Sequence, residues 1–119
     1  MKVAVIGSRS FTNYNVLDNI LKQHLKSEDI IVSGGATGAD SLSEQFAKQN
    51  GHKTFIYLPN WKIYGKSAGF IRNKQIVDNS DYIIAFWNGT SKGTLNSINL
   101  AKEQGKQVFV YDFNGSIVK

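Results

Sequence analysis

The sequence predicts an α/β protein with a doubly wound, mostly parallel sheet and helices on both of its faces. Two observations lead to this fold class. Short, continuously apolar runs, typical of strands buried on both faces, alternate along the chain with longer segments that have helical spacing. The links between them are short, which favours parallel strands joined by right-handed helical crossovers.

The first half of the chain supplies two strands and two helices. Val3–Ile6 is a continuous apolar run and predicts a buried strand. Residues 14–25 place leucine and isoleucine on one face at helical spacing, and Ile30–Val32 is a β-branched second strand. A second helix is expected over residues 40–49, because Asn50-Gly51 is a typical helix end.

The second half continues the alternation. Residues 53–58 predict a third strand, which Pro59 ends, and we expect a long loop from there to Ser67. The remaining expected elements are helices over residues 68–79 and 94–104 and strands over residues 82–86 and 107–111. The tail from Asp112 to Lys119 has weak signals, compatible with a short edge strand.

Composition narrows the possible functions. A chain of 119 residues predicts one domain over residues 1–119. It has no cysteine and only two histidines, so we expect no disulfide, no metal site and no cofactor. No apolar run approaches the ~18 residues of a membrane span, and the start is too short for a signal peptide, so a cytoplasmic location is expected. The net charge of +5 favours anionic partners, although the lysines are spread along the chain.

Four loops follow the predicted strands, and they should meet at one edge of the sheet. They are residues 7–9, 33–38, 61–66 and 87–94, and together they are rich in hydrogen-bond donors and aromatic side chains. In a doubly wound sheet the ligand lies outside the carboxyl ends of the strands, where the strand order reverses. The convergence of these loops predicts a binding site there.

The loop Ser33–Gly38 is the strongest single candidate for anion binding. Its glycines let the backbone turn sharply and leave N–H groups uncovered, and the helix opening at Asp40 adds the positive end of its dipole. A phosphate is the ligand that fits best. The spacing matches neither a dinucleotide fingerprint nor a P-loop, and an ordinary glycine turn is the alternative. Residues 89–94 are similar and could hold a second anionic group.

Several side chains could complete this site. Arg9 and Arg72 offer guanidinium groups for a phosphate, the alternatives being an exposed loop arginine and a salt bridge. Asp40 could accept from a ribose hydroxyl or act as a general base, or simply cap its helix. Trp61 and Trp87 could stack on a base, although Trp87 could equally belong to the core. The expected ligand-binding residues are Gly7, Ser8, Arg9, Ser33, Gly34, Gly35, Thr37, Gly38, Asp40, Trp61, Arg72, Asn73, Trp87, Ser91, Gly93 and Thr94, with Asp40 as the candidate catalytic residue.

Three segments, Val32–Asp40, Gly65–Asn73 and Ala85–Thr94, resemble the SLOG superfamily, and most of all its small YspA/YpsA-related branch. The resemblance implies a Rossmann-like fold of bacterial or phage type that binds nucleotides or nucleotide-derived signals. The superfamily includes LOG-type enzymes, which hydrolyse the bond between base and ribose phosphate, the DNA-processing protein A family, which binds single-stranded DNA, and sensor domains of bacterial immune systems. LOG-type enzymes carry a glutamate three residues after the threonine that matches Thr94, whereas this chain has Ser97.

Three functions therefore remain open. The leading hypothesis is a protein that binds a nucleotide or nucleotide-derived small molecule in order to sense, sequester or process it. The first alternative is an N-glycosidic nucleotide hydrolase that uses Asp40. The second is a single-stranded nucleic-acid-binding protein that uses its basic surface and loop aromatics. No membrane partner is expected, and a homo-oligomer, possible in related folds, is compatible with the sequence.

Overall fold

The computed structural model describes residues 1–118 and has one five-stranded sheet with all strands parallel, in the order β3-β2-β1-β4-β5. The strand order runs outward in one direction from β1 to β3 and in the other from β4 to β5, so it reverses between β1 and β4. This confirms the predicted doubly wound α/β class. The strands are β1 (Lys2–Gly7), β2 (Ile30–Ser33), β3 (Thr54–Ile56), β4 (Tyr82–Phe86) and β5 (Val108–Tyr111). The helices are α1 (Tyr14–His24), α2 (Ala39–Asn50), α3 (Trp61–Tyr64), α4 (Ala68–Asp78) and α5 (Lys92–Glu103).

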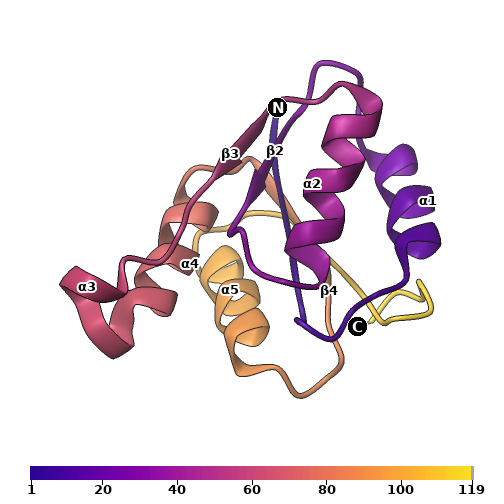
Figure 1. Ribbon diagram of the computed structural model, residues 1–119. Helices are drawn as coiled ribbons and strands as arrows, with labels where there is room; N and C mark the ends of the chain where they lie inside the picture. The colour runs from indigo at the N-terminus through magenta and orange to yellow at the C-terminus, as the bar shows by residue number, and fades with distance from the viewer. Residues whose placement is uncertain (119) are drawn as a thin grey trace.

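The helices form two layers, with α1 and α2 on one face of the sheet and α4 and α5 on the other (Figure 1). Each face has its own buried core. Under α1 and α2, the rings of Phe11 and Phe86 stack with centroids 4.7 Å apart, and the same core includes the buried Phe46, whose ring stacks on His52. Under α4 and α5 the core is smaller and aliphatic, with Val32 and Ile83 fully buried. The two cores fix the positions of the loops that leave the strands.

The expectation of a plain loop between Pro59 and Ser67 was wrong. The segment contains α3 and a 3-10 turn over Gly65–Ser67, and the Asn60 side chain caps α3 by accepting from the Ile63 N–H at 3.2 Å. All four residues of α3 are exposed, and the helix projects from the body of the molecule (Figure 1). A helix this short has no apolar periodicity, which is why spacing alone did not reveal it.

Other differences are small. Strand β3 is shorter than the predicted 53–58, and α5 begins at Lys92 rather than Thr94 because the Ser91 hydroxyl caps it by accepting from the Thr94 N–H at 3.4 Å. The tail adds one isolated antiparallel bridge between Tyr111 and Ile117. Lys119, at the end of that tail, lies outside the described residues.

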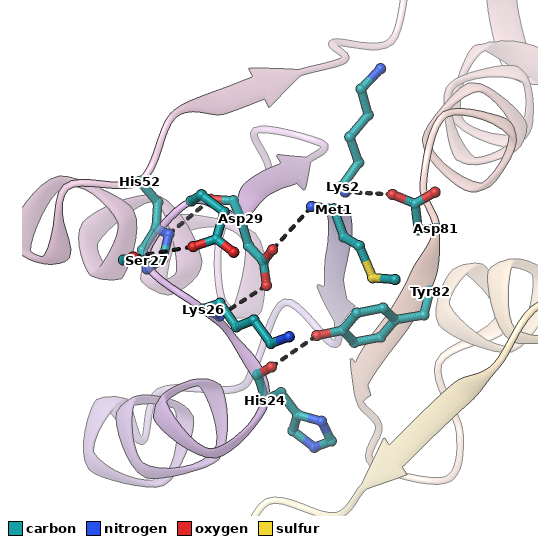
Figure 2. Close-up of polar contacts among 10 residues, drawn as sticks. Met1, Lys2, His24, Lys26, Ser27, Asp29, His52, Asp81 and Tyr82 are labelled. Atoms are coloured by element: carbon teal, nitrogen blue, oxygen red, sulfur yellow. Dashed lines mark hydrogen bonds and ion pairs between the residues drawn. The ribbon is translucent and has the colours of Figure 1, made fainter.

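The edge of the sheet formed by the amino ends of the strands is held by structural polar contacts (Figure 2). The Met1 amine pairs with Asp29 Oδ1 at 3.0 Å, and the Lys2 N–H donates to Asp81 Oδ2 at 2.7 Å. His52 Nδ1 hydrogen-bonds the Asp29 carbonyl oxygen at 2.8 Å. These contacts join β1 to the turns before β2 and β4, at the edge opposite the predicted site.

Candidate functional site

A cavity of about 470 Å³ opens at the carboxyl ends of β1 and β4, where the strand order reverses. It is the position at which doubly wound sheets bind ligands. Nine of the predicted site residues line it: Gly7, Ser8, Arg9, Asp40, Arg72, Asn73, Ser91, Gly93 and Thr94. We call it the main cavity.

Close backbone approach brings two of the predicted loops together. Gly38 has φ +76° and ψ −130°, and a Cβ on it would lie 2.4 Å from the Ser8 carbonyl oxygen and 2.5 Å from that of Arg9. Only glycine fits a positive φ and so short a contact. The loop after β2 therefore rests directly on the loop after β1, which carries Arg9 to the cavity.

Arg72 reaches the cavity from α4 and is held in place by the fold. It is 9% exposed; its Nη1 donates to the Gly34 carbonyl oxygen at 2.6 Å and its Nε to Asn73 Oδ1 at 3.0 Å. Burial lowers the pKa of Arg72, the charge of Asp40 acts against this, and the charge of Arg9 lowers that pKa further. A guanidinium group stays protonated at neutral pH despite such a shift, so the cavity holds a fixed cation.

Asp40 is the carboxylate that lines the main cavity among the described residues. Burial raises its pKa to about 6, with Glu44 adding to the increase, while the Ala36 N–H and Arg72 oppose it. The Ala36 N–H donates to Asp40 Oδ2 at 3.2 Å. Glu44 is instead bonded to the Ser33 hydroxyl, which donates to it at 2.8 Å. A carboxyl group that titrates near pH 6 can exchange protons with a ligand close to neutral pH.

The protein itself satisfies some amides of the glycine loop. The Gly35 N–H donates to Ser33 Oγ at 3.3 Å, and the Ala36 N–H is taken by Asp40. Within residues 1–118, the amides of Thr37 and Gly38 have no acceptor. Fewer amides are thus free for an anion than the glycine pattern alone indicates.

The loop after β4 is organised by Asn88, which was not among the predicted site residues. Its Oδ1 accepts from the amides of Thr90 at 2.9 Å and Ser91 at 2.8 Å and from the Thr90 hydroxyl at 3.1 Å. Its own N–H donates to Ser8 Oγ at 3.2 Å, which joins this loop to the loop after β1. The first turn of α5, including Gly93, faces the cavity and directs the positive end of the helix dipole toward it.

The remaining predicted residues lie outside the lining of the main cavity. Trp61 is 55% exposed on α3, and Trp87 lines a separate cavity of about 350 Å³ and donates its Nε1–H to the Ser91 carbonyl oxygen at 3.0 Å. Contact of either tryptophan with a ligand stays a prediction. The other predicted residues outside the lining are Ser33, Gly34, Gly35, Thr37 and Gly38, which shape the glycine loop.

Six further residues of the lining were not among the predicted site residues. The additional residues are Ile6, Ser10, Ala36, Ile76, Asn88 and Ser97. The Asn88-Gly89 dipeptide is a turn signal that could have revealed Asn88, whereas the aliphatic residues carry no signal of a site. Residues 1–118 contain no group of three histidine, cysteine or acidic side chains arranged to hold a metal ion. None of the helices in this range is long and apolar enough to cross a membrane.

Two solved structures of other proteins have a similar fold. The DNA processing protein A (DprA) of Streptococcus pneumoniae has a TM-score of 0.78 and 26% identity, with 92% of this chain and 50% of that chain covered. DprA of Helicobacter pylori, whose structure describes a single-stranded DNA binding mode, has a TM-score of 0.75 and 24% identity over 93% of this chain and 65% of its own. This chain thus spans about half and about two thirds of the two DprA chains.

At the level of sequence, the Gene 61 protein of Mycobacterium phage D29 is 29% identical over 113 residues, which cover 87% of this chain and 90% of the phage protein. A sequence model of the YspA, cpYpsA-related SLOG family (YAcAr) matches residues 1–64, a segment that contains β1, β2 and the glycine loop. That match extends over more than half of the chain, and the chain belongs to the YspA, cpYpsA-related SLOG family.

Proposed function

We propose that this protein binds a nucleotide or a nucleotide-derived small molecule through a phosphate group in the main cavity. One observation carries the proposal. Arg9 and Arg72 line the same cavity, and among the described residues neither has a carboxylate within ion-pair distance. The charge of Asp40 acts on Arg72, but within residues 1–118 Asp40 forms no ion pair with it and leaves Arg9 unpaired. Two guanidinium groups that line one cavity and form no ion pair in this range favour an anionic ligand.

The rest of the lining supports a phosphate in particular. The start of α5 contributes its dipole, and Ser8, Ser91 and Thr94 contribute hydroxyl groups that can donate to phosphate oxygens. A cavity of about 470 Å³ lies within the range of small-molecule sites. This combination of cations, hydroxyls and a helix start matches phosphate better than a carboxylate ligand, which has fewer oxygens to satisfy.

The test measures binding of inorganic phosphate and nucleoside monophosphates by calorimetry, with Arg9→Ala as the variant. Arg9 is exposed and makes no side-chain hydrogen bond within residues 1–118, so its loss should leave the fold intact. We expect affinity to fall at least tenfold, as for loss of a charge-assisted hydrogen bond. Lys48→Ala, an exposed cation on α2, is the matched control and should bind like wild type. Equal affinities for Arg9→Ala and Lys48→Ala would exclude the proposal.

A second candidate function, single-stranded nucleic-acid binding, is favoured by the distribution of charge. Residues 53–77 contain five lysine or arginine residues and no acidic residue. The rest of the chain has nine basic and nine acidic residues, so the whole net charge of +5 comes from this segment. The same segment exposes aromatic rings, including Trp61 at 55%, Tyr64 at 46% and Phe70 at 56%. Exposed aromatics among lysines are what sequence-tolerant binding of single strands requires. The single-stranded DNA binding described for Helicobacter pylori DprA is consistent with this candidate.

Hydrolysis of an N-glycosidic bond is a third candidate and depends on Asp40. Its position in the main cavity and a pKa of about 6 suit a general acid or base. Ser97, three residues after Thr94, lines the cavity where the related hydrolases have a glutamate, so Asp40 would have to act alone. Release of free base from a nucleoside monophosphate by wild type, and its loss in Asp40→Asn, would support hydrolysis. Intact nucleotide after prolonged incubation with wild type would exclude it for that substrate.

A further inference from the structure

Among residues 1–118, the lining of the main cavity offers a nucleobase no aromatic ring on which to stack, and the proposed function assigns its two guanidinium groups, Arg9 and Arg72, to the phosphate. Of the described residues in this lining, the large apolar ones are Ile6 and Ile76. Stacking is a major part of base binding in proteins that recognise nucleotides. If the proposed function holds, an aromatic stacking surface for the base of a bound nucleotide has to come from outside this lining.

A second cavity, of about 220 Å³, lies on the β3 side of α4 and shares Arg72 with the main cavity. Leu58 forms part of its wall, and a Cβ on Gly35 would lie 2.6 Å from Leu58 Cδ2. The glycine loop, whose Ala36 lines the main cavity, therefore packs against a wall residue of the second cavity. It is smaller than a typical small-molecule site and fits one ring system rather than a whole nucleotide.

The lining of the second cavity combines flat, apolar and amide groups. Tyr64 contributes a ring that is 46% exposed, and Ile71 contributes an aliphatic wall. Arg72, fixed by its bond to the Gly34 carbonyl, contributes a planar guanidinium. Phenol rings and guanidinium planes both stack on flat heteroaromatic rings.

Two side-chain amides supply hydrogen bonding in this cavity. Asn60 uses its Oδ1 to cap α3, which leaves its Nδ2 hydrogens as donors. The Gln75 amide makes no hydrogen bond within residues 1–118 and offers both a donor and an acceptor. The edges of nucleobases present donors and acceptors side by side, and amides pair with them in a bidentate manner. Of the described residues that line the cavity, only Arg72 is charged.

We infer that the second cavity is a nucleobase subsite, with Tyr64 and Arg72 as stacking surfaces and Asn60 and Gln75 reading the edge of the base. This inference rests on the proposed function of the main cavity. The base belongs either to the nucleotide whose phosphate occupies the main cavity or to the adjacent nucleotide of a single strand.

The test compares four probes by calorimetry: inorganic phosphate, ribose 5-phosphate, a nucleoside monophosphate and a dinucleotide. The variants are Tyr64→Ala and Gln75→Ala, both at exposed positions where truncation should not unfold the protein. Ile63→Ala, 71% exposed on the same short helix, and Gln45→Ala, an exposed amide on α2, are the matched controls.

We expect Tyr64→Ala and Gln75→Ala to weaken binding of a base-containing probe roughly tenfold. Phosphate and ribose 5-phosphate should bind as they do to wild type, and the controls should leave every probe unaffected. Loss with both the mononucleotide and the dinucleotide assigns the subsite to the base of the same nucleotide; loss with the dinucleotide alone assigns it to the adjacent one. Wild-type affinity of both variants for all base-containing probes would overturn the inference while leaving the phosphate site intact. Failure of wild type to bind any probe, phosphate included, would overturn the proposed function and the subsite together.

Discussion

Arg72 Nη1 donates a hydrogen bond of 2.6 Å to the carbonyl oxygen of Gly34, across 38 residues of sequence. A Cβ on Gly34 would lie 2.7 Å from the same Nη1 and 2.9 Å from Asp40 Oδ2, so the approach requires a residue without a side chain. The bond joins α4 to the loop after β2 and fixes the guanidinium without any ligand. A cation held by the fold loses little side-chain entropy when it binds an anion, which favours affinity.

The contact between the first two loops predicts that Gly38 is among the positions least tolerant of substitution. Gly38→Ala would place a Cβ 2.4 Å from the Ser8 carbonyl oxygen in a backbone conformation restricted to glycine. We expect the free energy of unfolding, measured in urea, to fall by more than about 3 kcal/mol. Gly51 has the same φ of +76° with nothing within 4 Å, so Gly51→Ala should cost only about 1 kcal/mol. Equal losses in the two variants would contradict the role of the close approach.

The raised pKa of Asp40 predicts a specific dependence of stability on pH. Because burial raises the folded-state pKa to about 6, above about 3.9 in the unfolded chain, the folded state binds the proton more tightly. The contribution of Asp40 to stability is therefore fully present below about pH 4 and is lost as the pH rises to about 6, by up to about 3 kcal/mol.

Asp40→Asn should remove this dependence, so the variant should gain stability relative to wild type as the pH rises from 4 to 7. Urea unfolding of both proteins at matched pH values measures the difference, in which the other titrating groups, such as Asp29 and Asp78 with their lowered pKa values, cancel. Parallel curves for the two proteins would show that Asp40 has an ordinary pKa.

The fold was predictable because its signals are local. Val3–Ile6 and Tyr82–Phe86 are apolar without interruption, and Asn50-Gly51 ends α2 as its residue types indicate. The main cavity was predictable to the extent that topology alone brings the loops after β1, β2 and β4 to one edge.

The rest depends on contacts between distant residues. Asp40 accepts a hydrogen bond from the Ala36 amide, and Ser33 accepts one from the Gly35 amide. Both bonds depend on the direction of the accepting side chain, which the spacing of the glycines does not reveal. Trp61 lies outside the lining of the main cavity because it belongs to the short helix α3. The sequence signal for this helix is the single capping residue Asn60, since four residues are too few to show an apolar periodicity.

The cationic segment 53–77 predicts how binding to an oligonucleotide would respond to salt. If a single strand follows this surface, Lys62→Ala and Lys66→Ala should each lower the slope of log affinity against log salt by about 0.7, the value for one phosphate contact. Trp61→Ala should weaken binding roughly tenfold without changing the slope, since stacking releases no counter-ions. Fluorescence anisotropy with a labelled oligodeoxythymidylate at several salt concentrations measures both. The control is Lys102→Ala, which removes an exposed cation from α5. If this variant lowers the slope as much as Lys62→Ala and Lys66→Ala do, the effect comes from net charge and not from the surface of residues 53–77.

Asn88 allows the structure of the phosphate site to be separated from its electrostatics. Its Oδ1 accepts three hydrogen bonds from Thr90 and Ser91, so Asn88→Ala should lower the free energy of unfolding by about 2 kcal/mol. Asn88→Asp keeps an acceptor oxygen at this position and should retain most of that stability, but it adds a negative charge to the lining of the main cavity.

The aspartate variant should therefore melt within about 4 °C of wild type, which corresponds to about 1 kcal/mol for a domain of this size, and yet bind phosphate and nucleoside monophosphates roughly tenfold more weakly. Thermal melts and calorimetry on the two variants measure the two effects independently. If Asn88→Asp binds phosphate as tightly as wild type, the anion does not lie near this loop, and the phosphate must be placed against Arg72 and the glycine loop instead.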